Sequence, residues 1–379
     1  MGRNVDLVFQ SRLADYRVDQ WEQAVYGTAP RSYYDAWDKQ ACVVPVSDWP
    51  ERRLYHAYFD GIWRPRVLAP YPEAVEKVEG TIRERGPSSA ADLADLDLPG
   101  SDDGGRKGSW FGPRLINHVL KALWFTGRLV THHRKNGRHV YAPADAVVPD
   151  EILARPPDPP QQTLEWLVLR RHQSAGLLRP GAGKPVFSLP PENAPLRSII
   201  QGLVERGDLV PIEVEGVLFH GVREQIEMFA NDGPSTGAVR FLAPLDSLLW
   251  DRKAVRHLYE FDYVWEVYKP AEKRIYGYYV LPVMYGTELV GRVEFTRKAT
   301  GALSATAWWE ERHEARLRDD EFLGDLADAL RRFRVYAGAD EVVAEEQTGI
   351  LAAATRAIRS DRAAALPRDR AAGPSPSSS

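Results

Sequence analysis

The residues most suggestive of chemistry are the basic side chains between positions 104 and 141, a stretch that contains no acidic residue. Across the whole chain acidic residues outnumber lysine and arginine by 53 to 49, which gives a formal net charge of −4. A local excess of cations in such a chain is typical of a surface that neutralises nucleic-acid phosphates and releases their counterions. We therefore predict that six residues bind DNA, namely Arg114, Lys121, Arg128, Arg134, Lys135 and Arg138. The simpler alternative is a solvated face beside a flexible loop.

No motif of a known catalytic class accompanies this basic block. The sequence lacks a Walker loop, a G-x-G-x-x-G loop and the H-E-x-x-H and G-x-S-x-G motifs. Cys42 is the only cysteine, which excludes intrachain disulfides and cysteine-based zinc ribbons and favours a reducing cytoplasm. His132 and His133 are adjacent, and neighbouring residues of a strand point to opposite faces, so one metal ion could hardly bind both. We expect neither a metal nor a cofactor.

One pair of charged residues lies beside a tryptophan. Asp38 and Lys39, next to Trp37, could form an acid/base pair in a cleft. A surface ion pair on a helix is the more common arrangement for such neighbours, and it contributes little to stability. These residues are therefore expected to be structural.

Two aromatic segments later in the chain have similar alternatives. Residues 244–252 combine two carboxylates, an indole and an arginine, and the simpler interpretation is that Asp246 caps a helix while Trp250 joins the core. Asp251 is the second carboxylate of that segment. Three tyrosines could stack on bases, although alternating tyrosines on a strand are usually half-buried packing residues: Tyr276, Tyr278 and Tyr279.

The composition indicates a globular protein of several compact parts. The chain has 379 residues, of which 44% are hydrophobic and 27% charged, and this balance excludes wholesale disorder and collagen-like or coiled-coil repeats. No apolar run approaches the roughly 20 residues that span a bilayer, and no signal-peptide core follows Met1. We expect a soluble, cytoplasmic monomer without membrane contact.

Residues 72–150 have the pattern of a winged helix-turn-helix domain. One amphipathic helix covers positions 75–82, Ser89 offers a cap for a short helix over 90–96, and a core-facing helix from about 113 ends at Gly127. Two short strands, 128–130 and 139–141, then flank the turn Asn136-Gly137, the strongest two-residue signal for a hairpin.

The pattern of helix, glycine and strand recurs in residues 151–236, with predicted helices near 162–175 and 195–206 and an alternating run over 209–220. Beyond position 237 the hydrophobic period becomes two, which predicts strands over 264–268, 274–283, 288–297 and 302–309, followed by a helix over 319–336. From about position 360 the chain is expected to be disordered. The fold class predicted is α+β: tandem winged helix-turn-helix domains, then an antiparallel β-barrel-like domain with a C-terminal helix.

The predicted boundaries follow these changes of pattern. Residues 1–71 are expected to be a partial, mostly helical N-terminal winged-helix domain, because their apolar start, Val5 to Phe9, has no earlier element to pack against. Winged-helix domains follow at 72–150 and 151–236. A β-barrel-like domain with its helix covers 237–343, and 344–379 are expected to hold a helix remnant and a disordered tail.

Four segments, in this order along the chain, resemble the winged-helix DNA glycosylases of crosslink repair, the YcaQ-like or AlkZ-like family. They are Arg3-Asn-Val-Asp-Leu-Val-Phe-Gln-Ser-Arg-Leu13, Tyr34 to Pro45 with Asp48-Trp49-Pro50, Pro244 to Arg252, and Tyr276-Gly-Tyr-Tyr-Val-Leu-Pro282. The resemblance covers roughly residues 3–343. It implies three winged helices and a β-barrel that wrap double-stranded DNA, and an enzyme that excises N7-alkylated purines and unhooks interstrand crosslinks.

The same resemblance implies a simple catalytic apparatus. An N7-alkylated purine is already a cationic leaving group, so a polar pair that positions water and stabilises the sugar cation suffices. In the family this pair is a Gln-x-Gln or Gln-x-Asp motif shortly before the segment that matches Arg3-Asn4. No glutamine here has that spacing: Gln10, Gln20, Gln23 and Gln40 all fall outside such a motif. Asp38-Lys39 also departs from an Ala-His pair expected in many members.

These departures leave the catalytic residues unassigned and two explanations open. We expect that the recorded start lies downstream of the true one, so that the native protein is a glycosylase whose pair is absent from this sequence. The alternative is a catalytically silent DNA-binding relative. A winged-helix transcriptional regulator with a β effector domain is the competing function from another class. Preference for alkylated DNA over any particular unmodified sequence would favour repair.

Overall fold

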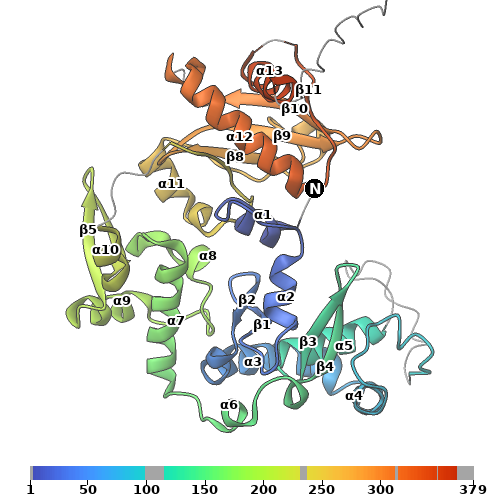
Figure 1. Cartoon of the computed structure of the whole chain (residues 1–379). Helices are drawn as coiled ribbons and strands as arrows, with labels where there is room; N and C mark the ends of the chain where they lie inside the picture. The colour runs from blue at the N-terminus through green and yellow to red at the C-terminus, as the bar shows by residue number, and fades with distance from the viewer. Residues whose placement is uncertain (1–2, 99–114, 231–236, 312–314, 348, 365–379) are drawn as a thin grey trace, which may run out of the picture. The chain divides into compact units, whose positions relative to one another are not determined.

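The computed structural model describes residues 3–98, 115–230, 237–311, 315–347 and 349–364. The chain divides into two compact units (Figure 1). The terminal unit joins Met1–Val18 to Asp232–Ser379, and the central unit is Asp19–Asn231. The finer division into five domains remains a prediction.

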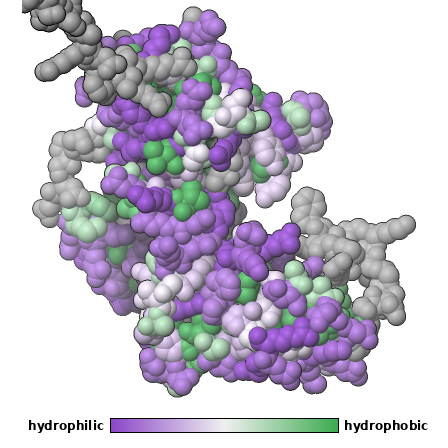
Figure 2. Space-filling model, turned by 45° about the vertical axis from the view of Figure 1, so that its right-hand side comes forward, coloured by the Kyte–Doolittle hydropathy of each residue, from purple (hydrophilic) through white to green (hydrophobic). Residues whose placement is uncertain are grey.

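The face shown in Figure 2 is mostly hydrophilic, and its hydrophobic residues form small separate patches. Within the part of the chain that is described, no helix is both long and apolar enough to cross a membrane.

The terminal unit is built on a five-stranded sheet in the order β11-β10-β9-β8-β7. All neighbouring strands are antiparallel except β10 and β11, which are parallel. The strands are β7 (Val239–Phe241), β8 (Val280–Tyr285), β9 (Glu288–Arg297), β10 (Leu303–Glu310) and β11 (Val342–Ala344). Within the described residues no pairing joins β7 to β11, so the sheet has two ends and is not a closed barrel. The strand predicted over 264–268 is wrong, and the one predicted from 274 begins only at Val280.

Helix α12 (Asp320–Tyr336) packs on this sheet, as the sequence predicts. The Asp319 carboxylate caps the helix by accepting the N–H of Phe322 at 2.8 Å. The ring of Phe333 meets Phe241 of β7 and Phe295 of β9, at centroid distances of 5.2 and 4.6 Å. A further helix, α13 (Gly349–Ala364), continues past the position where disorder is predicted, and residues 365–379 lie outside the described range.

The apolar start of the chain has its packing partner within the terminal unit. Helix α1 (Asn4–Gln10) buries Leu7 completely, and the Asn4 side chain accepts the N–H of Leu245 at 2.9 Å. The Arg12 guanidinium donates two hydrogen bonds to the carboxylate of Asp246, at 2.7 and 2.9 Å. The expectation for this segment concerns only an earlier packing partner, whereas the structure supplies one more than two hundred residues later in the sequence, which only folding reveals.

The central unit begins with helix α2 (Gln20–Tyr26) and a hairpin of β1 (Tyr33–Trp37) and β2 (Ala41–Pro45), followed by α3 (Trp49–Trp63). The prediction that residues up to 71 are mostly helical holds for α3 but misses the hairpin. A π-helical turn (Arg64–Leu68) leads from α3 towards the next helix.

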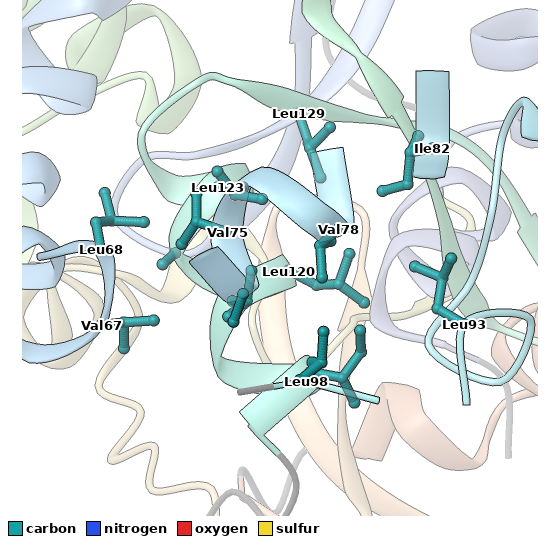
Figure 3. Packing of buried hydrophobic residues seen from close by; sticks show 14 residues of the cluster. Val67, Leu68, Val75, Val78, Ile82, Leu93, Leu98, Leu120, Leu123 and Leu129 are labelled. Atoms are coloured by element: carbon teal, nitrogen blue, oxygen red, sulfur yellow. The ribbon is translucent and has the colours of Figure 1, made fainter. Parts of the chain in front are cut away.

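Two successions of helices and a hairpin follow in the central unit. The first comprises α4 (Pro72–Arg85), α5 (Leu115–Phe125), β3 (Leu129–Lys135) and β4 (Arg138–Pro143). The second, after α6 (Asp150–Ala154), comprises α7 (Pro160–Ala175), α8 (Lys184–Phe187), α9 (Leu196–Glu205), β5 (Leu209–Val214) and β6 (Val217–Val222), and α10 (Arg223–Ala230) ends the unit. In the first, Val75, Val78 and Ile82 of α4 belong to one buried cluster with Leu120 and Leu123 of α5 (Figure 3).

The short helix predicted over 90–96 is a series of turns. Ser89 and Asp92 bond reciprocally as in a helix cap, with the Ser89 N–H and hydroxyl donating to the Asp92 carboxylate at 2.9 and 2.6 Å. The backbone bonds that follow join residues three apart, as from the N–H of Leu96 to the carbonyl of Leu93 at 3.2 Å. Such bonds do not propagate into an α-helix, although Leu93 is buried in the same core.

Removing the Arg12 side chain is expected to destabilise the terminal unit. Asp246 is fully buried, so Arg12→Ala would leave a desolvated carboxylate without two of its hydrogen bonds. We expect the free energy of unfolding to fall by about 1–3 kcal/mol, measured by urea denaturation at pH 7. Lys253→Ala, which removes an exposed cation from α11 (Arg252–Tyr259), is the matched control and should change little. Equal stability of both variants would contradict this role for Arg12.

Candidate nucleic-acid interface

The tip of the β3–β4 hairpin presents two cations to solvent. Asn136 and Gly137 have positive φ angles of 52° and 75°, the left-handed conformation of a two-residue hairpin turn. Lys135 and Arg138 flank this turn as a cross-strand pair and are exposed. No ion pair joins either side chain to a carboxylate among the residues described. The hairpin predicted from Asn-Gly is confirmed, and it holds two of the predicted cations together at one edge.

Two other residues predicted to bind DNA, Lys121 and Arg128, contact side chains of the protein itself. The Lys121 ammonium, on α5, lies 6.0 Å from the ring centroid of Trp63 and 5.8 Å from that of Phe125, and burial lowers its pKa. Arg128 forms an ion pair with Glu79 of α4. Arg114 lies outside the described residues.

Arg134 connects the hairpin to neighbouring elements of the central unit. Its guanidinium donates to the Asp35 carboxylate at 3.0 Å and to the Tyr26 hydroxyl at 3.2 Å, and only 16% of the side chain is exposed. These contacts tie β3 to β1 and α2. Arg134 is therefore placed to position the hairpin, whereas Lys135 and Arg138 are exposed to solvent.

A β-bulge brings the two adjacent histidines together. The pairing of β3 with β4 shifts between Thr131 and His133, and the Nδ1 atoms of His132 and His133 lie 2.8 Å apart. The expectation that these side chains point to opposite faces is wrong, because the bulge inserts an extra residue and breaks the strict alternation. Arg31 braces this bulge by donating to the carbonyls of Thr131 and His132. Among the described residues no cluster of three or more potential ligands could hold a metal ion.

Asp38 is buried between two arginines, not paired with Lys39 on a helix. It follows β1, and its carboxylate accepts hydrogen bonds from Arg52 of α3, at 2.9 Å, and from Arg171 of α7. Burial alone would raise the pKa of Asp38, but the charges of Arg171 and Arg52 outweigh it and lower the pKa to about 2. The Tyr55 hydroxyl donates a further bond at 3.2 Å. A carboxylate that stays ionised and is so fully paired is a poor general acid or base near neutral pH.

The pocket above this network has aromatic walls. It measures about 370 Å³ and is lined by Trp37 of β1, by Tyr58 and Phe59 of α3 and by side chains of the segment 184–196 such as Phe187, with Asp38 among its lining residues. Neither the pocket nor the two arginines that bind Asp38 are identified from the sequence. In the sequence, Arg52 and Arg171 lie within predicted helical segments, where arginine is usually exposed. No neighbouring residue indicates that they enclose a buried carboxylate.

The remaining candidates are structural in the terminal unit. Asp246 caps a short 3-10 turn by accepting the N–H of Leu248 at 3.1 Å, and Asp251 caps α11 through the N–H of Ala254 at 3.2 Å. The prediction of a capping role for Asp246 is confirmed. Trp250 is half-buried, not in the core, and its indole N–H donates to the Leu245 carbonyl at 3.2 Å.

Replacing the buried carboxylate is expected to weaken the central unit in a pH-dependent manner. Asp38→Asn would leave two buried guanidinium groups without their counter-charge, so the free energy of unfolding at pH 7 should fall by about 3–5 kcal/mol. The folded pKa of about 2 lies below the value of about 3.9 in an unfolded chain. The stabilisation by the charge is therefore present above pH ~4 and is lost as the pH falls towards the folded pKa.

Urea denaturation at several pH values checks this expectation. The gap between wild type and Asp38→Asn should narrow as the pH falls through that window. The exposed Asp158→Asn serves as the control and should show no such gap. A gap of the same size at the lowest and the neutral pH would contradict the role of the Asp38 charge.

Comparison with known proteins agrees with this architecture. Residues 2–336 match the family described as DNA glycosylase AlkZ-like. Among solved structures, the DNA glycosylase AlkZ of Streptomyces sahachiroi superposes with a TM-score of 0.55 at 15% sequence identity, over 89% of this chain and 88% of that one. At such low identity the likeness shows a common α+β fold. Because the family match spans most of the 379 residues, the chain belongs to the AlkZ-like family of DNA glycosylases, which are enzymes of DNA repair.

Proposed function

We propose that this chain binds double-stranded DNA that carries N7-alkylated purines or interstrand crosslinks, and that the β3–β4 hairpin contacts the DNA backbone. The observation that carries this proposal is the exposed pair Lys135 and Arg138 at the tip of a supported hairpin. Cations held at a fixed spacing and not consumed by internal carboxylates are the groups that neutralise phosphates.

The order of elements around this hairpin supports a winged helix-turn-helix domain. Helix α4, the turns near Leu93, helix α5 and the β3–β4 hairpin share one core. In such a domain the last helix enters a groove of the DNA and the hairpin lies on the backbone beside it. We assign these parts to α5 and to β3–β4, and the succession from α7 to β6 is a second copy of the same arrangement.

The family resemblance implies that a Gln-x-Gln or Gln-x-Asp pair hydrolyses the N-glycosidic bond. This sequence does not contain that pair. A glycosylase must stabilise a cationic sugar and direct a water molecule at it. The sequence contains no Gln-x-Gln or Gln-x-Asp motif, and the Asp38 carboxylate is fully engaged with arginines. We therefore propose that these 379 residues provide DNA binding and that base excision requires such a pair in addition.

Neutralising the hairpin tip tests the binding proposal. Lys135→Ala with Arg138→Ala should weaken binding to a duplex and reduce the slope of log affinity against log salt by close to two, at about 0.9 for each phosphate contact. Fluorescence anisotropy across a salt series measures both quantities. The slope should change equally for unrelated duplex sequences, because phosphate contacts carry no sequence information.

Two exposed arginines elsewhere in the central unit provide the matched control. Arg66→Ala with Arg197→Ala removes the same charge elsewhere in the central unit. If this control lowered the affinity and the slope as much as the hairpin variant does, the effect would reflect net charge, and the hairpin would not be the contact.

Base release distinguishes binding from catalysis. With a duplex that contains N7-methylguanine, the 379-residue chain should bind but release no more free base than a protein-free sample, as measured by chromatography of the supernatant. Rapid release by this same chain would show that residues present here perform the hydrolysis.

A further inference from the structure

The connection from α11 to β8 in the terminal unit exposes large apolar side chains. Within residues 264–279, Tyr268 is 80% exposed, Ile275 75% and Tyr278 54%. The half-buried packing expected for alternating tyrosines on a strand does not describe this segment, since it precedes β8 and is not a strand. Three such side chains close together in the sequence are more than the scattered exposure usual on a protein surface.

Two carboxylates hold this loop in one conformation. Glu266, which is 4% exposed, accepts the N–H groups of Ile275 and Tyr276, at 2.9 and 2.8 Å. Glu294 of β9 accepts those of Tyr278 and Tyr279 through one oxygen, at 2.9 and 3.1 Å. The backbone bonds that a strand would make are thus replaced by side-chain acceptors. The exposed rings are presented by a fixed backbone, so that little entropy is lost when they bind.

A glycine permits this close approach. A Cβ atom at Gly277 would lie 2.6 Å from the Glu294 carboxylate, so no larger residue fits without displacing the group that anchors the loop.

Three basic residues, Lys269, Lys273 and Arg274, lie in the sequence between the exposed rings of Tyr268 and Tyr278. The Arg274 guanidinium lies 4.8 Å from the ring centroid of Tyr278 and donates to the Lys269 carbonyl at 2.9 Å, which joins the two sides of the loop. Lys273 is exposed beside it. The negative charge of Glu266 is met by Lys269, whose ammonium lies 2.8 Å away. Interleaved cations and aromatic faces are the chemistry by which proteins hold unstacked bases and their backbone.

We propose that the surface formed by Tyr268, Lys273, Arg274, Ile275 and Tyr278, here called the tyrosine loop, binds DNA whose bases are locally unstacked. Tyr268 and Ile275 pack against the open base faces, and Lys273 and Arg274 contact the flanking phosphates. The tyrosine loop thereby distinguishes distorted from intact duplex, whereas the hairpin contacts any duplex backbone. The inference rests on the proposed function, because it assumes that DNA is the ligand of the chain.

The test compares two duplexes that differ only by a bulge of three unpaired nucleotides, with binding measured by fluorescence anisotropy. Wild type should prefer the bulged duplex. Tyr268→Ala with Ile275→Ala should bind the bulged duplex roughly 5–100-fold more weakly, since stacking of one base on an aromatic side chain changes affinity by that order. The same variant should bind the intact duplex as wild type does. Tyr268→Phe keeps the ring and should keep the preference.

Two exposed apolar residues of the central unit provide the control. Met228 and Phe229 are 57% and 58% exposed on α10, and their replacement by alanine should leave the preference for the bulge intact. Loss of the preference in this control as well, or an unchanged preference in Tyr268→Ala with Ile275→Ala, would overturn the role of the tyrosine loop. Failure of wild type to bind either duplex would instead overturn the proposed function.

Discussion

A carboxylate removed from water must be surrounded by cations or N–H groups, and this requirement organises the irregular parts of both units. Asp38 accepts hydrogen bonds from Arg52 of α3 and Arg171 of α7. These bonds connect the β1–β2 turn to two helices that are far apart in the sequence. Asp246 does the same for the N-terminal helix through Arg12. An ion pair of this kind adds little net stability compared with an apolar contact, but removing one partner is costly because the other charge is left buried and unpaired.

Carboxylates of the protein also pair with some cations of the basic block. A basic stretch in the sequence suggests a continuous electropositive face, yet Arg128 is paired with Glu79 and Arg134 with Asp35. Lys135 and Arg138 remain exposed at the hairpin tip, and Arg134 ties β3 to α2 and β1 through Tyr26 and Asp35. In the proposed function, the paired arginines of this block build the surface, and the exposed pair at the hairpin tip contacts DNA.

Features encoded by neighbouring residues could be predicted from the sequence, whereas features created by distant contacts could not. The Asn136-Gly137 hairpin and the Asp246 cap depend on residues within a few positions of one another, and both are present. The strand predicted over 264–268 has the correct alternation, but the carboxylate of Glu266 satisfies the backbone of 275–276 and no ladder forms. The pocket beside Asp38 and the histidine pair at the β3 bulge likewise arise from contacts that no local pattern announces.

The composition of the terminal unit from two ends of the chain has a consequence for biosynthesis. Arg12 and Asp246 are 234 residues apart, so at roughly 5–20 residues per second the ribosome needs about 10–50 s to deliver the partner of α1. During that interval the face of α1 that buries Leu7 lacks its partner near residue 245, and by the end of the interval the central unit has emerged completely. Closing a flexible tether of that length costs about 5 kcal/mol of chain entropy, and prior folding of the central unit removes much of that tether. Co-translational folding is therefore expected to start in the central unit, before the terminal unit can assemble.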